Sequence, residues 1–221
     1  LISAGMGATV TVIDRNPVVL RRIANQLGAR VRTVFSTSDA IETLCRRADL
    51  VIAQAGAQPN VVMLDTEEHL PWAGHSARHA LGDIYRFIKT HRTTLIFVNT
   101  RSQAEFLFQE LWRVNDDNLA IALHHGSLDV AQRRRVEGAM AEGKLRAVVC
   151  TSSLDLGVDW GDVDLVINVG APKGCSRLQQ RIGRSNHRLD EPSEAVLVPA
   201  NRFEALECRA AIDAVAENAQ D

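Results

Sequence analysis

The chain has 221 residues, of which 46% are hydrophobic and 24% charged, and its formal net charge at pH 7 is −2. A chain of this length buries a substantial apolar core as one or two globular domains. The near-neutral charge excludes a basic field spread over the whole molecule, so any nucleic-acid binding must come from local basic clusters.

The other bulk features exclude secreted and membrane classes. The four cysteines form no C-x-x-C pair, which favours reduced thiols over disulfides or a zinc site. No apolar run approaches the ~20 residues of a membrane span, and the first residues lack the order of a signal peptide. We therefore expect a cytoplasmic protein without a membrane partner. The first residue is Leu1 rather than Met, which predicts a fragment.

Short β-branched runs alternate with amphipathic stretches along the chain. Strands are predicted at 9–14, 31–35, 49–53, 61–64, 94–98, 119–123, 146–150, 164–169 and 194–198. Helices are predicted at 17–27, 76–90, 101–113, 128–142 and 202–217. This order predicts an α/β fold with a mostly parallel sheet and helices on both faces. In such folds, ligands bind at the carboxyl ends of the strands.

Residues 1–53 contain a strand that ends in Asp14, a helix, a strand, a helix and a third strand. This βαβαβ order resembles the nucleotide-binding domain of alanine dehydrogenases and the related transhydrogenase subunit, where Asp14 would bind the adenosine ribose hydroxyls of NAD. In the 3-2-1-4 strand order the first strand lies between the second and the fourth, but here that strand and its G-x-G-x-x-G turn are absent. The surviving "GMG" precedes the strand of Asp14 and cannot replace them. We expect an incomplete Rossmann-like fragment, with Asp14 only ending a strand and no NAD binding.

The stretch "AQAGAQPN", residues 53–60, is rich in small residues and predicts a linker. We expect a first domain at 1–53, a junction at 54–60 and a second domain at 61–221. A natural fusion, a rearranged gene, an assembly artefact and a designed chimera would each produce such a junction.

Four successive strands of the second part are followed by polar, glycine-containing or basic residues. These segments are "NTR" (99–101), "HHGSL" (124–128), "TSSLDLGVDWGDVD" (151–164) and "QQRIGRSNHR" (179–188). The carboxyl ends of parallel strands share one edge of a sheet, so the four segments predict one continuous anion-binding rim. Arginine suits such a rim because it stays charged and presents a planar fork to phosphate oxygens.

These segments, in this order, resemble the motifs of the second RecA-like domain of superfamily 2 helicases. "FVNTR" resembles motif IV, "TSSLDLGVD" motif V and "QRIGRSNHR" motif VI. The run "GRSNHRLDEPSEAVLVPANRFEALECRAA", with "LPWAGHSARHA" upstream, is closer still to the ligase-associated DEXH-box helicases of the Lhr-like group. The resemblance covers about residues 55–221 and implies a parallel sheet of RecA-like type.

The resemblance also implies roles for single residues. Arg184 would be the arginine finger that stabilises charge on a transferred γ-phosphoryl group, and Arg181 would organise the cleft. The family pattern Q-R-x-G-R-x-x-R places a second finger at position 187, which is His187 here, with Arg188 one residue later. The nucleotide-binding set would be Gly157, Asp159, Gln180 and His187, with the Asp159 carboxylate facing the ribose. The positions that contact the nucleic-acid backbone, without reading its sequence, would be Thr100, Arg101, Gly126 and Thr151.

Simpler interpretations stand beside some of these. Asp155 is equally well a turn former. His75 and His79 imitate a metal pair, but no glutamate base or third ligand accompanies them, so we assign them to a surface helix and expect no metal site. The three tryptophans could stack on bases. Packing is favoured for Trp112 because it lies on an apolar helix face, whereas Trp160, just after the motif V aspartate, stays open.

Phosphate cleavage needs a phosphate cradle, a magnesium-holding carboxylate and a positioned water. In this class they come from G-x-x-x-x-G-K-[ST] and a D-E-x-[DH] box, and neither pattern occurs in the 221 residues. We expect the C-terminal half of an ATP-dependent helicase that acts on single-stranded nucleic acid, with DNA favoured. It would be inactive alone and would bind ATP and Mg²⁺ only with a complementing first RecA-like domain. Two alternatives are a fragment of an NAD-dependent alanine dehydrogenase-like oxidoreductase and a non-enzymatic α/β module that binds nucleic-acid backbone.

Overall fold

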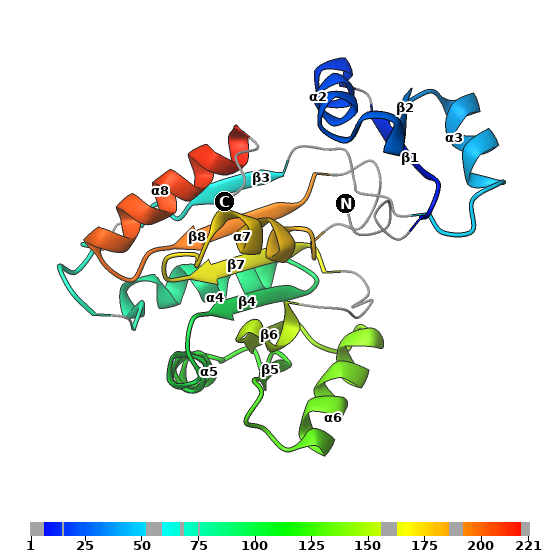
Figure 1. The fold of residues 1–221 in the computed structure, drawn as a ribbon. Coiled ribbons are helices and arrows are strands. Elements are labelled where there is room, and N and C mark those ends of the chain that lie inside the picture. The colour runs from blue at the N-terminus through cyan, green and yellow to red at the C-terminus, as the bar shows by residue number, and fades with distance from the viewer. Residues whose placement is uncertain are drawn as a thin grey trace. The chain divides into compact units, whose positions relative to one another are not determined.

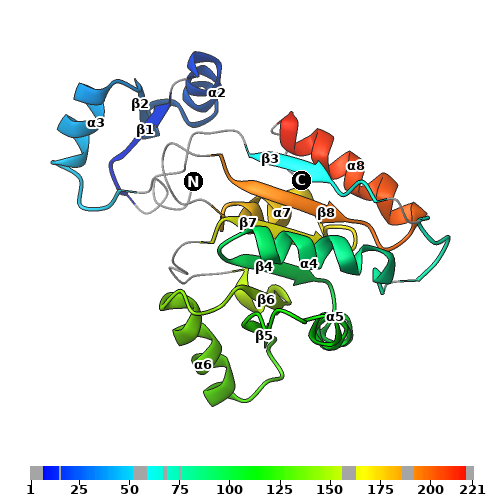
Figure 2. The same cartoon turned by 180° about the vertical axis from the view of Figure 1, so that it is seen from behind.

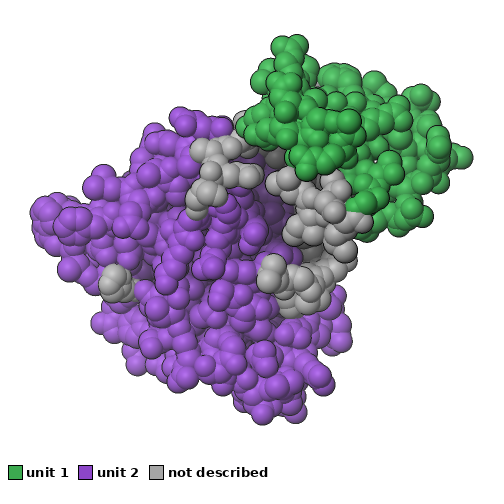
Figure 3. Space-filling model, viewed as in Figure 1, with its two compact units in different colours: residues 1–54 green, residues 55–221 purple. Residues whose placement is uncertain are grey.

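The computed structural model of the chain describes residues 7–14, 16–51, 59–66, 69–74, 76–155, 163–185 and 192–217. The chain divides into two compact units, residues 1–54 and residues 55–221, which Figure 3 shows in different colours. Each unit has its own sheet.

The first unit pairs two parallel strands, β1 (Val10–Asp14) and β2 (Val31–Phe35). The helix α2 (Pro17–Leu27) and the 3-10 turn η1 (Gly28–Arg30) connect them, and α3 (Ser38–Cys45) follows β2. The sequence sets the start of α2, because the Asn16 side chain accepts the amide of Val18 and Pro17 occupies the first turn, where no amide is needed.

The third strand predicted at 49–53 is wrong in its described part. Residues 49–51 form no strand, and Leu50 and Val51 are 76% and 52% exposed. In the expected strand order this segment would pair with the first strand of the Rossmann-like unit, and the sheet of the described residues contains only β1 and β2. Without that neighbour, no hydrogen-bond ladder offsets the entropy lost on ordering the backbone. The described part of the fragment is therefore βαβα.

The second unit is built on one six-stranded sheet in the order β3-β8-β7-β4-β6-β5, and every pairing is parallel. Its strands are β3 (Asn60–Met63), β4 (Thr94–Val98), β5 (Ile121–His124), β6 (Ala147–Cys150), β7 (Leu165–Val169) and β8 (Glu194–Val198). All six strands predicted between 61 and 198 are present. The predicted α/β class with a parallel sheet is confirmed.

Helices cover both faces of this sheet, as Figures 1 and 2 show from opposite sides. One face packs against α4 (Leu81–Thr90) and α5 (Arg101–Arg113). The other packs against α6 (Val130–Ala141), α7 (Cys175–Ile182) and α8 (Arg202–Ala216). From Leu95 to Val98, successive residues of β4 alternate between the two cores, and all five residues of the strand are buried. A strand covered on both faces needs such a continuous apolar run.

The helix predicted at 76–90 begins later than expected. It opens as a 3-10 turn, η2 (Arg78–Ala80), and becomes α-helical only at Leu81. The residue before this turn, Ala77, has φ +48°, a left-handed conformation that an α-helix cannot include. The helix predicted at 101–113 has the expected bounds.

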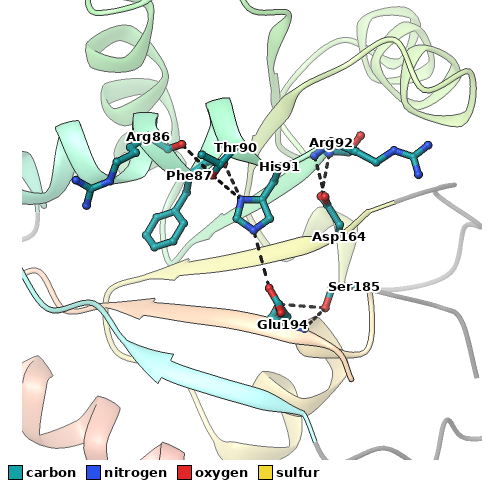
Figure 4. A network of polar contacts seen from close by, with 9 residues as sticks. Arg86, Phe87, Thr90, His91, Arg92, Asp164, Ser185 and Glu194 are labelled. Atoms are coloured by element: carbon teal, nitrogen blue, oxygen red, sulfur yellow. Dashed lines mark hydrogen bonds and ion pairs between the residues drawn. The ribbon is translucent and has the colours of Figure 1, made fainter. Parts of the chain in front are cut away.

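Polar contacts join the amino-terminal ends of three strands (Figure 4). The Asp164 carboxylate accepts the amides of Arg92 at 2.8 Å and Thr93 at 3.0 Å, which ties the start of β7 to the start of β4. His91 Nε2 lies 3.9 Å from Glu194 Oε2 at the start of β8. These contacts fix the sheet at the end opposite the predicted rim. Of the helices that the structure describes, none is long and apolar enough for a membrane crossing.

Candidate functional site

The four predicted backbone-binding residues lie at the carboxyl ends of adjacent strands. Thr100 and Arg101 follow β4, Gly126 follows β5 and Thr151 follows β6. Because β4, β6 and β5 are neighbours in the sheet, the structure brings all four to one edge. Thr151 is half-buried and the other three residues are exposed. We call these four residues the rim. Their contact with nucleic acid stays a prediction.

The helix α5 begins at the rim with a capping box. Thr100 Oγ1 accepts the amide of Gln103 at 3.2 Å, and Gln103 Oε1 accepts the amide of Thr100 at 3.0 Å. The positive end of the helix dipole therefore lies at the rim, where it favours an anion. Arg101 Nε donates to Glu105 Oε1 at 3.0 Å. This ion pair is exposed at both side chains and therefore weak.

His124, the last residue of β5, connects three elements beneath the rim. Its Nδ1 lies 2.8 Å from Ser153 Oγ in the 3-10 turn η3 (Ser152–Leu154), and its Nε2 lies 3.1 Å from Glu137 Oε1 in α6. Burial lowers the pKa of His124, and the contact with Glu137 opposes that shift only in part. The buried ring thus holds the turn that follows Thr151. The sequence predicted only that "HHGSL" follows a strand, and it gave no sign of this cluster.

Three arginines from α7 and the turn after it converge on Asp155. Its Oδ1 accepts Arg181 Nε at 2.9 Å, and its Oδ2 lies 3.5 Å from Arg177 Nε. Its backbone carbonyl accepts Arg184 Nη2 at 2.7 Å. Asp155 also caps the end of η3, so it is a turn residue that accepts hydrogen bonds from two guanidinium groups and forms an ion pair with a third. Sequence analysis missed Arg177, although its spacing of four residues from Arg181 places both on one side of a helix.

Arg181 is buried and held on several sides. Its Nη1 donates to Asn168 Oδ1 in β7, and its guanidinium carbon lies 4.7 Å from the centroid of the Phe97 ring. A buried charge is tolerated only while such partners remain in place. The geometry therefore favours the organising role predicted for Arg181 over direct contact with a phosphate.

The structure describes two of the arginines predicted to act on the nucleotide, Arg181 and Arg184, and Arg184 has fewer side-chain contacts. It is half-buried, and its hydrogen bond to the Asp155 carbonyl uses a neutral acceptor. Its Nε is buried and has no hydrogen-bond partner within the described residues. Gln180 is exposed on α7. The predicted site residues Gly157, Asp159, His187 and Arg188 lie outside the described residues, as do His75 and Trp160.

The remaining candidates take simpler roles. Asp14 Oδ1 accepts the amide of Asn16 at 2.6 Å in the turn that leads into α2. His79 lies in η2, and the described residues contain no group of three side chains able to hold a metal ion. The packing predicted for Trp112 is only partial, because this residue contacts Phe108 but is 60% exposed.

One stretch approaches the phosphate-loop pattern without completing it. "GAMAEGKL", residues 138–145, has Leu145 where the pattern requires Ser or Thr. A phosphate loop joins the end of a strand to the start of a helix. Here Gly138 lies inside α6, Gly143 and Lys144 follow its end, and Lys144 pairs with Glu142. This stretch therefore forms no phosphate cradle.

Comparison with known proteins identifies two families along the chain. The helicase conserved C-terminal domain matches residues 76–188, and the C-terminal domain of alanine dehydrogenase/PNT matches residues 1–66. The ATP-dependent helicase Lhr-Core of Methanocaldococcus jannaschii is 43% identical over 122 residues, which are 55% of this chain and 14% of that protein. The Lhr helicase/probable uracil glycosylase of Mycolicibacterium smegmatis is 34% identical over 157 residues, 57% of this chain and 10% of that protein. The chain thus spans a small part of the length of these relatives.

Solved structures agree with this similarity. Mycobacterium smegmatis helicase Lhr, bound to ssDNA and AMP-PNP, is 29% identical and superposes with a TM-score of 0.69 over 96% of this chain and 31% of its own. The DUF1998 helicase MrfA bound to DNA, at 19% identity and a TM-score of 0.59 over 72% of this chain and 23% of its own, supports the fold alone. The predicted resemblances to Lhr-like helicases and to alanine dehydrogenases are both confirmed, and so is the RecA-like fold class. The helicase model covers more than half of the residues, and the chain belongs to the family of helicase conserved C-terminal domains.

Proposed function

We propose that this chain is the C-terminal half of the motor of an ATP-dependent nucleic-acid helicase. One observation carries the proposal. Asp155 lies in the turn after the rim residue Thr151, and it accepts hydrogen bonds from two arginines. Its carboxylate binds Arg181, and its backbone carbonyl binds Arg184. The segment expected to touch nucleic acid and the helix expected to touch nucleotide are therefore joined through one buried residue. Such a connection lets a change at one site alter the other.

Arg184 is proposed as the residue that meets the γ-phosphate. Its guanidinium would exchange the Asp155 carbonyl for phosphate oxygens as negative charge develops on the transferred group. A preceding RecA-like domain would supply the phosphate cradle and hold Mg²⁺, because the described residues offer neither a metal-binding group nor a cradle. The names of the Lhr relatives, which are ATP-dependent helicases, support the choice of ATP. The M. smegmatis complex with ssDNA and AMP-PNP supports single-stranded DNA as the partner.

A complementation assay tests the nucleotide role. The chain alone is expected to hydrolyse no ATP above background, with or without single-stranded DNA. Adding a separately purified first RecA-like domain from an Lhr helicase should restore DNA-stimulated turnover, and Arg184→Ala should abolish it. Arg209→Ala is the matched control, since Arg209 is an exposed arginine on α8 whose ion pair with Asp213 lies within that helix. Turnover by the isolated chain that depends on Arg184 would contradict the proposal.

A binding assay tests the rim. Phosphate contacts release counterions, so affinity for single-stranded DNA should fall steeply as salt rises. Arg101→Ala should weaken binding equally for unrelated sequences and reduce the salt slope by about one counterion. Binding that ignores salt, or that is confined to one sequence, would exclude the rim as a phosphate-binding surface.

A further inference from the structure

An open pocket of about 540 Å³ lies at the same edge of the sheet as the rim. Asn99, which lines it, directly precedes Thr100 and Arg101 after β4. Lys173 comes from the segment after β7, and Phe203 from the first turn of α8 after β8. Trp72 lies in the loop before η2. A strand that follows the rim past Arg101 would reach this pocket next.

The loop that carries Trp72 is fixed to the start of α8. The Arg202 amide donates to the Pro71 carbonyl at 3.1 Å, and Asn201 Nδ2 donates to the Gly74 carbonyl at 2.9 Å. The guanidinium carbon of Arg202 lies 4.2 Å from the centroid of the Trp72 ring. Even so, Trp72 is 67% exposed and Phe203 is 65% exposed. With Arg202 over one face and most of the residue open to solvent, the other face of Trp72 is left for a planar ligand.

The charges of the pocket select a neutral group over a phosphate. Glu204 and Glu207 both line it and would repel an anion placed among them. Lys173 is exposed, and it offers a cation to a phosphate lying outside the pocket. This division suits a nucleotide whose base enters while its backbone stays outside.

The amide side chains in the wall are already engaged. Asn99 Nδ2 donates to the Ala171 carbonyl at 2.8 Å, and Asn201 Oδ1 accepts the amide of Glu204 at 2.9 Å. Asn201 is thus engaged through both its Nδ2 and its Oδ1, whereas Asn99 donates one N–H and keeps its Oδ1 for the edge of a base. A single such acceptor discriminates weakly between bases, so recognition would rest mainly on stacking, which tolerates every base because each has a π-face.

We infer that this pocket is a base-stacking subsite, in which a base of a single strand lying along the rim stacks on Trp72, with Phe203 beside it and Lys173 near a neighbouring phosphate. The inference rests on the proposed function, since it requires a strand on the rim. It adds a binding contact that is specific for the presence of a base and indifferent to its identity.

Tryptophan variants of the whole chain test the inference by fluorescence anisotropy with labelled oligothymidylate. Trp72→Ala should weaken binding about five-fold or more, the lower bound for loss of one stacked base. Trp112→Ala is the matched control, because Trp112 is also exposed, at 60%, but lies on α5 outside the pocket. Trp72→Phe should retain most of the affinity. Neither Trp72 variant should change binding of an abasic oligomer of equal length, which keeps every phosphate and lacks every base.

A single-tryptophan form gives a direct signal. In the Trp112→Phe, Trp160→Phe background, oligothymidylate should quench the emission of Trp72, whereas the abasic oligomer should leave it unchanged.

The outcomes distinguish failure of the base-stacking subsite from failure of the proposed nucleic-acid binding at the rim. If Arg101→Ala weakens binding but Trp72→Ala does not, the subsite is wrong and the rim stands. Equal losses of Trp72→Ala on both oligomers would show that Trp72 acts through its loop, which also overturns the subsite. A dimer that Trp72→Ala dissociates, with oligothymidylate binding intact, would assign the pocket to contact between copies instead. If neither Arg101→Ala nor Trp72→Ala alters binding, the proposed function fails with the inference.

Discussion

The Asp155 carboxylate balances the buried positive charge of Arg181, so the stability of the second unit depends on this side chain. Asp155→Asn keeps the shape but removes the charge opposite Arg181, which is 2% exposed. An unbalanced buried guanidinium should lower the free energy of unfolding by about 3 kcal/mol or more, measured by urea denaturation. The control Asp213→Asn, in an exposed pair with Arg209, should stay within about 0.5 kcal/mol. A loss for Asp155→Asn as small as that of the control would mean that Asn168 and Phe97 alone suffice to hold Arg181.

His124 predicts a pH dependence of stability. Burial holds its pKa below the ordinary value, so the unfolded chain takes up a proton from about pH 6.5 downward while the native ring stays neutral. The stability due to the neutral ring is therefore complete above about pH 6.5 and is lost as pH falls toward the native pKa. His124→Gln, which places an amide toward Glu137 but cannot take up a proton in this range, should flatten this loss. Thermal melts of both forms between about pH 5 and 7 measure it, and parallel curves would exclude His124 as the source.

At the residue scale, sequence reasoning located the rim but not the groups around it. Thr100, Gly126 and Thr151 follow strands, and parallel strands bring such residues to one edge whatever the loops do. The contacts of Asp155 with Arg177 and of His124 with Glu137 depend on how a turn meets a helix across the sheet. Trp72 meets Arg202 across 130 positions of chain. No local pattern encodes such meetings, so the structure was needed to find them.

The start of a helix could be predicted from the sequence where capping residues close in the chain fix its first turn. The predicted starts of α2 and α5 match the structure because Asn16 with Pro17, and Thr100 with Gln103, fix the first helical turn through contacts within four residues. The prediction of a strand at 49–53 is wrong in its described part, because an apolar pattern alone does not make a strand. A strand also needs a neighbouring strand, and that depends on residues far away in the chain.

The capping box of α5 gives an element-scale prediction. Thr100→Ala removes the acceptor for the Gln103 amide and should cost about 1 kcal/mol of unfolding free energy. Thr100→Ser retains the hydroxyl and should restore most of it. Chemical denaturation compares the three forms, and an Ala variant as stable as the native chain would show that the helix start is fixed by packing alone.

The whole molecule should open in two steps. In the first unit β1 is only partly buried along its length, whereas Val148 and Val149 in β6 are fully buried between two layers of helices. Local opening free energies follow such burial. Native-state hydrogen exchange should be faster at Val10 and Val12 than at Val148 and Val149. Equal, slow exchange in both pairs would show one cooperative fold.

The two family matches do not fix the boundary between the two units, but the strand pairing in the structure does. The alanine dehydrogenase model extends to residue 66, which includes β3, while the compact units divide after residue 54. The pairing of β3 with β8 assigns residues 60–63 physically to the helicase sheet. Sequence similarity and hydrogen bonding thus disagree over about ten residues, and stability will follow the hydrogen bonds.

The place of β3 also sets an order of events during synthesis. β3 is the first strand of the second unit to be synthesised, yet its described partner is β8. The four other strands of the sheet lie between Met63 and Glu194 in the sequence. At about 5–20 residues per second, a ribosome needs roughly 10 s to make that stretch. For that time β3 has no partner, while β4, β6 and β5 can already pair. Completion of the sheet therefore waits for the synthesis of β8, and a nascent chain stalled before β8 would display an apolar strand to chaperones.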